Sequence, residues 1–353
     1  MKIAIITDTH VGARNDSITF NDYFIKFFDE VFFPYLENNK IEKIIHLGDV
    51  FDRRKYINFK ILDTWNRKIF PRLSKYDTHI VLGNHDTYYK NTNHVNSVEQ
   101  LLSHYNFNIY QSAETVTFDG LDILLLPWIN EENYQDTMDK INSSSASICM
   151  GHLEILGVEV FSGQVNTEHG LDKNVFKKFD MTFSGHFHHK SEHDDIYYLG
   201  SPYPMTWADW GCKRGFHIFD TETRELEFIE NKNEIFCKIV YDDTQEDYQS
   251  LMSQDLSSLN KMYVKVIVSK KTNPYWFESY LEKITEVGPS DLSVVESLVD
   301  DDNNTDEIDS TKDTLTLLTE YVDNLDIKEH KDKVIDLFRE LYVEAVNTDT
   351  SIS

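Results

Sequence analysis

The chain has 353 residues, 40% of them hydrophobic and 13% aromatic, and this composition excludes disorder over most of its length. A single core rarely grows beyond about 250 to 300 residues, so the length predicts one large domain with one or two small ones. The net charge of −27 disfavours nucleic-acid binding by the chain as a whole, because Lys and Arg supply most of the affinity for phosphates. The acidity is uneven, however, since residues 291–353 alone contain 18 acidic and 5 basic residues.

The cysteines and the apolar runs indicate the compartment. Cys149, Cys212 and Cys237 lie far apart and form no CxxC pattern, which indicates neither a disulfide framework nor a zinc finger. The first apolar run is only four residues long before Asp8, too short for the core of a signal peptide, and no run approaches the length of a membrane span. We therefore expect a cytoplasmic protein with no membrane segment.

The first two thirds of the chain contain apolar runs that end in polar residues. These predicted strands lie at 2–10, 42–52, 78–86, 121–128, 145–152 and 180–189. Helix-period segments at 20–36 and 58–70 separate the first three strands by the length of a βαβ crossover, which predicts parallel pairing. Later strands, at 195–202 and in a hairpin at 216–230, follow at shorter spacing and indicate antiparallel or mixed pairing. The pattern predicts an α/β fold, a sandwich of sheets flanked by helices, over residues 1–230.

The pattern changes after residue 230. Segments 234–241 and 261–268 are typical of strands and 273–287 is typical of a helix, which predicts a small α+β unit over 231–298. Residues 299–311 are acidic and poor in apolar side chains, as in an exposed linker. A pair of helical stripes follows at 312–347. Because two helices bury little apolar surface by themselves, this pair either folds back on the body or docks on a partner, and we favour the partner.

Side chains that can bind metals stand at the ends of five predicted strands. They are Asp8, His10, Asp49, Asn84, His152, His186 and His188. Ligands of open α/β sheets bind outside the carboxyl ends of the strands, so we expect these side chains to converge. In an extended segment residues i and i+2 face the same way, which lets Asp8 pair with His10 and His186 with His188. Oxygen and imidazole ligands suit Mn²⁺, Fe or Zn²⁺ rather than a soft thiolate site.

Seven ligands are too many for one ion, because a single metal needs about four. Two metals about 3.5 to 4 Å apart, bridged by a shared carboxylate, use all seven. Asp49 is the expected bridge, since Gly48 beside it lets the turn approach closely. We interpret His46 and His79, inside apolar strands, as core residues. His189 and His193 are expected to be loop residues outside the site.

The ordered set D-x-H, G-D-x-x-D, G-N-H-D, G-H and G-H-x-H resembles the signature of the calcineurin-like metallophosphoesterases. The segment GDVFDRRK, the YYKN after GNHD and the terminal helical pair are similar to the SbcD-type double-strand-break repair nucleases, including the recombination nucleases of large phages. The resemblance implies a four-layer β-sandwich, a DNA-binding capping domain at 231–298 and a helical pair that binds an SbcC-type coiled-coil ABC ATPase. It also implies a homodimer and, for a phage-encoded chain, the host cytoplasm.

The resemblance also implies roles for single residues. One metal would be held by Asp8, His10, Asp49 and His188, and the other by Asp49, Asn84, His152 and His186. His85 matches the catalytic histidine of the family, and two Mn²⁺ are the implied cofactors, with Mg²⁺ or Fe as alternatives. The implied reaction is hydrolysis of DNA, 3′-to-5′ from duplex ends and endonucleolytic on single strands or hairpins.

Contacts with DNA and partners are predicted from charge and apolar stripes. Candidate DNA-binding residues are Arg14, Arg53, Arg54, Lys55 and Lys90, and the candidate partner-binding residues are Leu318, Tyr321, Leu337, Phe338 and Leu341. The basic run from Arg53 to Arg72 is equally explained as a solvated helix face. Apolar stripes at 59–69 and 98–102 fit either dimer helices or core packing. Asp52 stands where several family members carry a histidine, and Arg53 either supplies the missing positive charge or pairs with Asp52.

Two other functions remain open from the sequence. A phosphoprotein or cyclic-nucleotide phosphoesterase of the same superfamily would share every metal ligand, but would not need the capping unit or the terminal helices. A non-catalytic scaffold that tethers DNA ends usually loses ligands, whereas all seven are present here together with His85.

Overall fold

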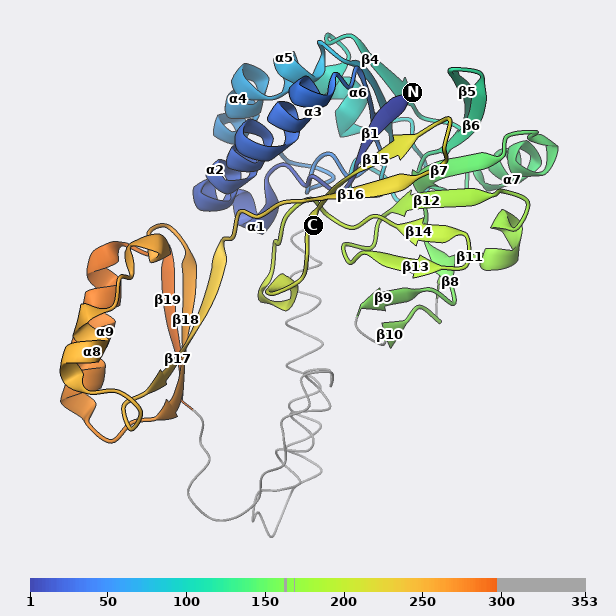
Figure 1. Cartoon of the computed structure of the whole chain (residues 1–353). Coiled ribbons are helices and arrows are strands. Elements are labelled where there is room, and N and C mark those ends of the chain that lie inside the picture. Colours follow the sequence, from blue (N-terminus) through green and yellow to red (C-terminus); the bar gives the residue numbers. More distant parts are fainter. Residues whose placement is uncertain (162–163, 168, 297–353) are drawn as a thin grey trace. The chain divides into compact units, whose positions relative to one another are not determined.

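The computed structural model describes residues 1–161, 164–167 and 169–296 (Figure 1). The predicted acidic linker at 299–311 and the helical pair at 312–347, with its partner-binding residues, lie outside the described residues. Residues up to about 230 form two six-stranded sheets that pack face to face with helices on their outer sides. The predicted four-layer α/β sandwich is confirmed.

The first sheet has the strand order β16-β15-β1-β2-β3-β4. Its strands are β1 (Lys2–Ile6), β2 (Lys43–His46), β3 (Asp77–Val81), β4 (Phe107–Tyr110), β15 (Gly215–Asp220) and β16 (Leu226–Glu230). Strands β1 to β4 pair in parallel, while β15 pairs antiparallel with β1 and forms the predicted hairpin with β16. The parallel pairing predicted from the crossover lengths is therefore confirmed, and the ends of β1, β2 and β3 lie along one edge.

The second sheet has the order β13-β14-β12-β7-β6-β5. Its strands are β5 (Glu114–Phe118), β6 (Leu121–Leu126), β7 (Ile148–His152), β12 (Met181–Gly185), β13 (Ser191–His193) and β14 (Ile196–Tyr198). Short pairs lie beside it: β8 (Ile155–Leu156) with β11 (Leu171–Asp172), and β9 (Glu159–Phe161) with β10 (Gln164–Val165). β14 runs parallel to β12 and antiparallel to β13, so the sheet is mixed, as predicted.

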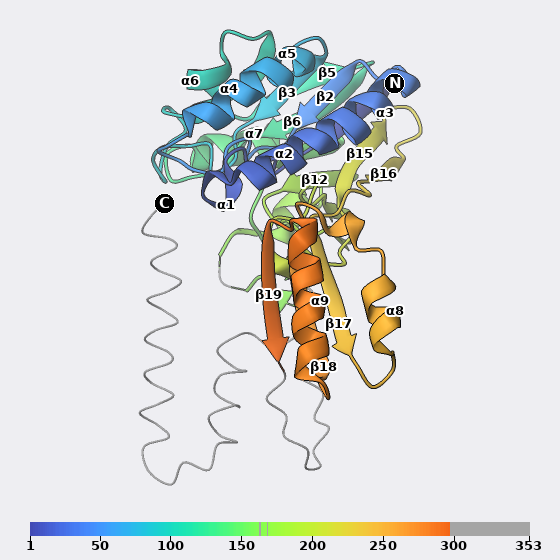
Figure 2. The ribbon, with the colours of Figure 1, turned by 90° about the vertical axis from the view of Figure 1, so that its left-hand side faces the viewer.

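Helices cover the outer face of each sheet. The first sheet is covered by α2 (Ile18–Phe27), η1 (Phe28–Phe32), α3 (Phe33–Asn39), α4 (Phe59–Lys68), α5 (Phe70–Leu73) and α6 (Ser97–Leu102), and the second by α7 (Tyr134–Ser143) and η2 (Lys173–Phe176). Two short turns, α1 (Ala13–Asp16) and η3 (Trp207–Asp209), complete the body. Figure 2 looks onto α2, α3 and α4, which lie over strands of the first sheet. No helix of the described residues combines the length and the apolar character needed to span a bilayer.

Strand β1 is buried on both faces. Ile3 and Ile5 belong to the core between the two sheets, whereas Ala4 and Ile6 belong to the core beneath the helices. This alternation follows from the period of two along a strand, and it explains why β1 reads as a continuous apolar run. Packing on both faces therefore fixes the position of the end of β1, which Asp8 and His10 follow.

The stripes considered for a dimer pack mostly into the core. Trp65 and Ile69 of the first stripe and Val98 and Leu102 of the second are buried. Trp65 also donates from Nε1 to Asn21 Oδ1 at 2.9 Å. Phe59 at the start of α4 is different, because its side chain is 84% exposed.

The unit after residue 230 is a second α/β layer pair. Three parallel strands, β17 (Phe236–Asp242), β18 (Tyr263–Lys270) and β19 (Asp291–Glu296), are joined through α8 (Tyr248–Ser253), η4 (Ser257–Leu259) and α9 (Pro274–Val287). Val264, Phe277 and Ile284 lie in its core. The sequence predicted two of these strands and α9 but missed β19, because most of its residues are exposed and it ends next to an acidic stretch.

Strand β15 carries a buried histidine that makes stability depend on pH. His217 is 3% exposed, and burial, with the charge of Lys190, lowers the pKa of its imidazole to about 3. The unfolded chain protonates this ring near its ordinary pKa of about 6.5, so the unfolded state binds more protons between these two values. Stability therefore falls as pH drops through that window. We expect His217→Leu to reduce this loss by about 1 kcal/mol per pH unit, measured by urea unfolding at several pH values.

The exposed His104 provides the control, because its ring is hydrated in both states. The variant His104→Leu should keep the wild-type dependence of unfolding free energy on pH. Equal slopes for the wild type and His217→Leu would contradict the expected effect.

Candidate metal centre

The carboxyl ends of strands from both sheets meet at one place. β1 is followed by Asp8 and His10, β2 by Asp49 and β3 by Asn84, all from the first sheet. In the second sheet, β7 ends at His152 and β12 is followed by His186 and His188. Contacts between these side chains join all seven into one cluster. The structure thus brings together every predicted ligand.

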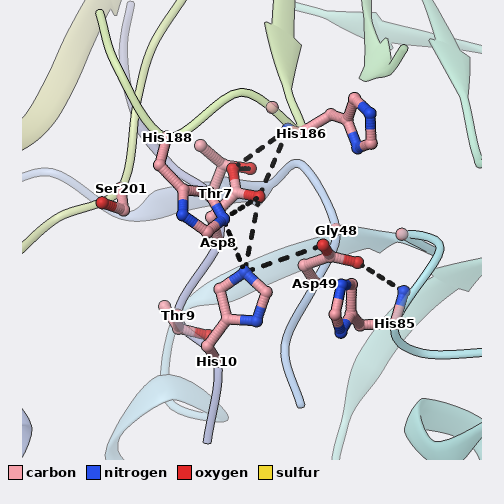
Figure 3. A network of polar contacts seen from close by, with 12 residues as sticks. Thr7, Asp8, Thr9, His10, Gly48, Asp49, His85, His186, His188 and Ser201 are labelled. Atoms are coloured by element: carbon pink, nitrogen blue, oxygen red, sulfur yellow. Dashed lines mark hydrogen bonds and ion pairs between the residues drawn. The ribbon is translucent and has the colours of Figure 1, made fainter. Parts of the chain in front are cut away.

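The first group of ligands consists of Asp8, His10 and His188 (Figure 3). The Nε2 atoms of His10 and His188 are 3.0 Å apart. Asp8 Oδ1 lies 3.8 Å from His10 Nε2 and 3.9 Å from His188 Nε2. Two imidazole nitrogens and a carboxylate oxygen therefore surround one point, an arrangement that a divalent cation satisfies.

The second group consists of Asn84, His152 and His186. Asn84 Oδ1 lies 2.9 Å from His152 Nε2 and 3.0 Å from His186 Nδ1. The side chain of His186 points away from Asp8 while its backbone N–H donates to the Asp8 carboxylate (Figure 3). The two histidines of the motif G-H-x-H, His186 and His188, thus belong to different groups.

Asp49 joins the two groups. Its Oδ2 lies 3.7 Å from His10 Nε2 and 3.4 Å from His152 Nε2. Its other oxygen, Oδ1, accepts a hydrogen bond from the backbone N–H of His85 at 2.8 Å. One carboxylate oxygen therefore faces both groups, which is the position required of a bridging ligand.

The donor set fits divalent cations, because the second nitrogen of several rings is already engaged. His152 Nδ1 donates to the Leu47 carbonyl at 2.7 Å, which leaves the lone pair of Nε2 directed at the cluster. His10 Nδ1 lies 3.4 Å from Asp52, and His186 Nε2 lies 3.9 Å from Glu154. Contacts of this kind fix the tautomer of a ligating histidine and raise its basicity.

The charges of the site also favour cations. Burial alone would raise the pKa of the Asp8 and Asp49 carboxyl groups, but neighbouring histidines hold both well below their usual range. Burial would lower the pKa of His152, yet Asp49 and Asp8 raise it to about 9. The buried carboxylates therefore stay ionised and protons on His10 and His152 balance them, whereas burial lowers the pKa of His188 to about 4. A metal ion would replace these protons, so its binding should release them.

Four of the seven ligands adopt left-handed backbone conformations. The φ angles are 52° at Asp8, 42° at His10, 53° at Asp49 and 86° at His186. Such angles are uncommon outside glycine, cost about 1 kcal/mol or more each, and cluster at functional sites. Asp8 and His10 therefore converge through a turn after β1 and not through the alternation of an extended strand, which corrects the expected reason for their pairing.

Two glycines allow the strand ends to approach. At Gly48, with φ of 91°, a Cβ would lie 2.7 Å from the Gly83 nitrogen and from His152 Nδ1. At Gly83 a Cβ would lie 2.1 Å from Asp49 Oδ1. The close turn expected beside Asp49 is thus present, and it requires glycine on both strands.

His85 lies at the edge of the cluster and is half-buried. Its Nδ1 donates to the backbone carbonyl of Asp52, because a carbonyl oxygen only accepts. The ring stands edge-on to that of His10, with centroids 5.0 Å apart. Nε2 is therefore the nitrogen left for substrate, and the contacts described above among the seven candidate ligands do not involve it.

Asp52 faces His10 rather than Arg53. Burial would raise the pKa of the Asp52 carboxyl, but the neighbouring His10 ring, 3.4 Å away, lowers it overall. Arg53 instead pairs with Asp16 at 3.0 Å. The expected Arg53–Asp52 pair is therefore absent among the described contacts, and Asp52 orients a candidate metal ligand.

Three other histidines, His46, His79 and His193, have structural contacts. His46 accepts from the Gly48 N–H and contacts Thr9 Oγ1, and His79 contacts the Tyr110 hydroxyl, which supports their interpretation as core residues. His193 lies in β13 and accepts from the backbone N–H of Glu159, so it is a strand residue and not the loop residue expected.

Among the candidate DNA-binding residues, Arg14, Lys55 and Lys90 are exposed. The Arg54 guanidinium is more enclosed, and its NH1 atom is buried without a hydrogen-bond partner in the described part of the chain. Several other cations of the basic run pair with acids: Arg67 with Asp63 and Arg72 with Asp29. The DNA-binding roles stay predictions.

Sequence reasoning missed Trp128 and Glu154. The Trp128 ring centroid lies 5.2 Å from that of His186 and 6.1 Å from that of His152. Trp128 follows β6, which pairs with β7, so a sixth strand end reaches the same edge. In the sequence, the apolar run at 121–128 ends in Pro127 and Trp128, and this strand end was the signal that could have identified Trp128.

The model of the family described as calcineurin-like phosphoesterase matches residues 1–190, more than half of the chain. Exonuclease subunit 1 of Enterobacteria phage T4 is 35% identical over 351 residues, covering 98% of this chain and 99% of the relative. A solved archaeal phosphodiesterase is 14% identical with a TM-score of 0.32, covers 65% of this chain and 100% of its own, and supports no conclusion about the reaction. On the family match and on the similarity along its whole length, the chain belongs to the calcineurin-like phosphoesterases, metal-dependent hydrolases of phosphate esters.

Proposed function

We propose that the chain is a two-metal DNA nuclease. One cation would be held by Asp8, His10, Asp49 and His188, and the other by Asp49, Asn84, His152 and His186. The observation that carries the proposal is the position of Asp49 Oδ2, within 3.7 Å of His10 Nε2 and 3.4 Å of His152 Nε2. The similarity to a phage exonuclease subunit along nearly the whole chain supports DNA as the substrate.

The metal ligands and His85 have different roles in the proposed hydrolysis. When bound, two divalent cations lower the pKa of water toward neutrality and neutralise charge on the phosphate. The ligand carboxylates and imidazoles would hold both cations where the strand ends of the two sheets meet, and this fixes where the phosphodiester binds. His85, with Nδ1 tied to the Asp52 carbonyl, presents Nε2 to the substrate and, when protonated, donates a proton to the departing sugar oxygen.

The finer features of the proposal follow the family resemblance. They are Mn²⁺ as the metal, 3′-to-5′ exonuclease action on duplex ends, endonuclease action on single strands or hairpins, and work with an SbcC-type ATPase in double-strand-break processing. We place the protein in the cytoplasm, and the capping unit in contact with DNA. Phe59, at 84% exposed, and Tyr56, at 67% exposed, support a homodimer contact beside α4.

The test is hydrolysis of end-labelled duplex and single-stranded DNA by the purified chain with Mn²⁺, with and without an SbcC-type ATPase. We expect metal-dependent degradation, abolished by a chelator and restored by added Mn²⁺. Elemental analysis should find about two metals per chain.

A protein that binds two metals and leaves DNA intact even with the ATPase would overturn the nuclease proposal. Hydrolysis of p-nitrophenyl phosphate under those conditions would favour a phosphatase instead.

A further inference from the structure

A cavity of about 440 Å³ lies directly beside the second ligand group. Its walls include Trp128, Tyr134, His152, Leu153, Glu154 and Leu171. We propose that this cavity binds the base of a nucleotide next to the phosphodiester being cleaved. The proposal rests on the proposed nuclease function and deepens it by assigning a base subsite to the same centre.

The cavity shares one wall, His152, with the candidate metal centre. The Trp128 ring contacts the rings of both His152 and His186. In a nucleotide the base and the phosphate are separated by a single sugar. A phosphate held by these histidines therefore has its own base, or the neighbouring one, within reach of the cavity.

The tryptophan wall is held in place before substrate arrives. The backbone N–H of Trp128 donates to the carbonyl of Leu82 at 2.7 Å. Leu82 lies two residues before the candidate ligand Asn84. The Trp128 carbonyl accepts from Asn93 Nδ2 and from Asn133 Nδ2, each at 3.0 Å. Because hydrogen bonds fix both the N–H and the carbonyl of the Trp128 backbone, this residue loses little conformational entropy when a ligand binds. Its ring can therefore serve as a stacking platform.

The second aromatic wall is free to contact a ligand. Tyr134 is the first residue of α7, and its side chain is 47% exposed. Stacking between a base and an aromatic side chain tolerates every base, because each has a π-face. The pocket is therefore suited to a nuclease that removes nucleotides without strong sequence preference.

Charge decides which part of the nucleotide enters. Glu131 and Glu154 line the cavity, and two carboxylates outweigh the partial positive charge of about half a unit at the start of α7. A phosphate would be repelled from this wall, whereas a neutral base would not. The base enters the cavity and the phosphate stays with the metal ligands.

The kinetic test compares two single-stranded oligonucleotides that differ only at the terminal nucleotide, which carries either its base or an abasic tetrahydrofuran. We expect the wild type to release the normal nucleotide about ten-fold faster in kcat/KM. Tyr134→Ala should lower that ratio toward one. Gln135→Ala is the matched control, because it truncates an exposed residue of the same helix that does not line the cavity, and it should keep the wild-type ratio.

A binding measurement tests the base subsite without requiring that the protein cleave DNA. Calorimetry with dAMP and with deoxyribose 5-phosphate should show tighter binding of dAMP to the wild type. Trp128→Ala should lose the difference, and Trp128→Phe should retain most of it, because phenylalanine keeps a stacking face.

Equal rates on the normal and abasic oligonucleotides would overturn the base subsite while the nuclease function stands. If the wild type cleaves neither, the proposed function fails instead, and calorimetry decides the subsite: equal binding of dAMP and deoxyribose 5-phosphate would overturn it too.

Discussion

Asp49→Asn is expected to remove bound metal and nuclease activity together. Asp49 Oδ2 faces both ligand groups, and the asparagine amide would offer no negative charge and, with its oxygen on the His85 N–H, only an NH2 group in place of Oδ2. We expect fewer than two metals per chain by elemental analysis and a fall in DNA hydrolysis of about 10³-fold or more. The backbone should be preserved, because the amide oxygen can still accept from the His85 N–H.

The control for this variant removes a carboxylate elsewhere. Asp63 lies on α4 in an exposed pair with Arg67, so Asp63→Asn should keep both metals and full activity. An Asp49→Asn protein that retains two metals and cleaves DNA would show that Asp49 does not bridge.

His85→Ala is expected to separate chemistry from metal binding. The contact of His85 with Asp49 uses its backbone N–H, which alanine keeps, so the ligand geometry and the metal content should survive. The imidazole, whose Nε2 is available to substrate, is lost. Removal of a general acid or base typically lowers the rate about 10²- to 10⁴-fold, and we expect a fall of kcat in that range.

His94→Ala gives the matched control, because the His94 side chain is 79% exposed and pairs only with Glu132 among the described ion pairs. It should cleave DNA at the wild-type rate. If His85→Ala loses its metals as well as its activity, the ring is part of the metal site and the proposed role as a proton donor is wrong.

Local sequence patterns were sufficient for the architecture of the body. The crossover spacing between strands 2–10, 42–52 and 78–86 predicts parallel pairing, which the structure confirms. The same patterns were weaker in the unit after residue 230, where β19 was missed because a mostly exposed strand lacks a clear apolar period. Metal-ligand types were readable because they follow strand ends, and parallel strands bring those ends to one edge.

The arrangement of the site required the tertiary structure. The sequence shows that Asp8 and His10 are two residues apart, but not that both adopt left-handed backbone angles. Nor does it show that Asp52 turns toward His10 while Arg53 turns toward Asp16. These backbone angles and side-chain orientations depend on which partners lie nearby in space. A local sequence pattern carries no information about those partners.

The sequence by itself determined the fold class and predicted the seven candidate ligands, because these depend on residue identity at strand ends, whereas the role of His85 was implied by the family resemblance. Only the tertiary structure decided that one oxygen of Asp49 faces both groups and that Trp128 closes a pocket beside His152 and His186. The physical reason is distance along the chain. Trp128, His152 and His186 meet only because β6, β7 and β12 are neighbours in one sheet, and strand order is fixed by packing rather than by local pattern.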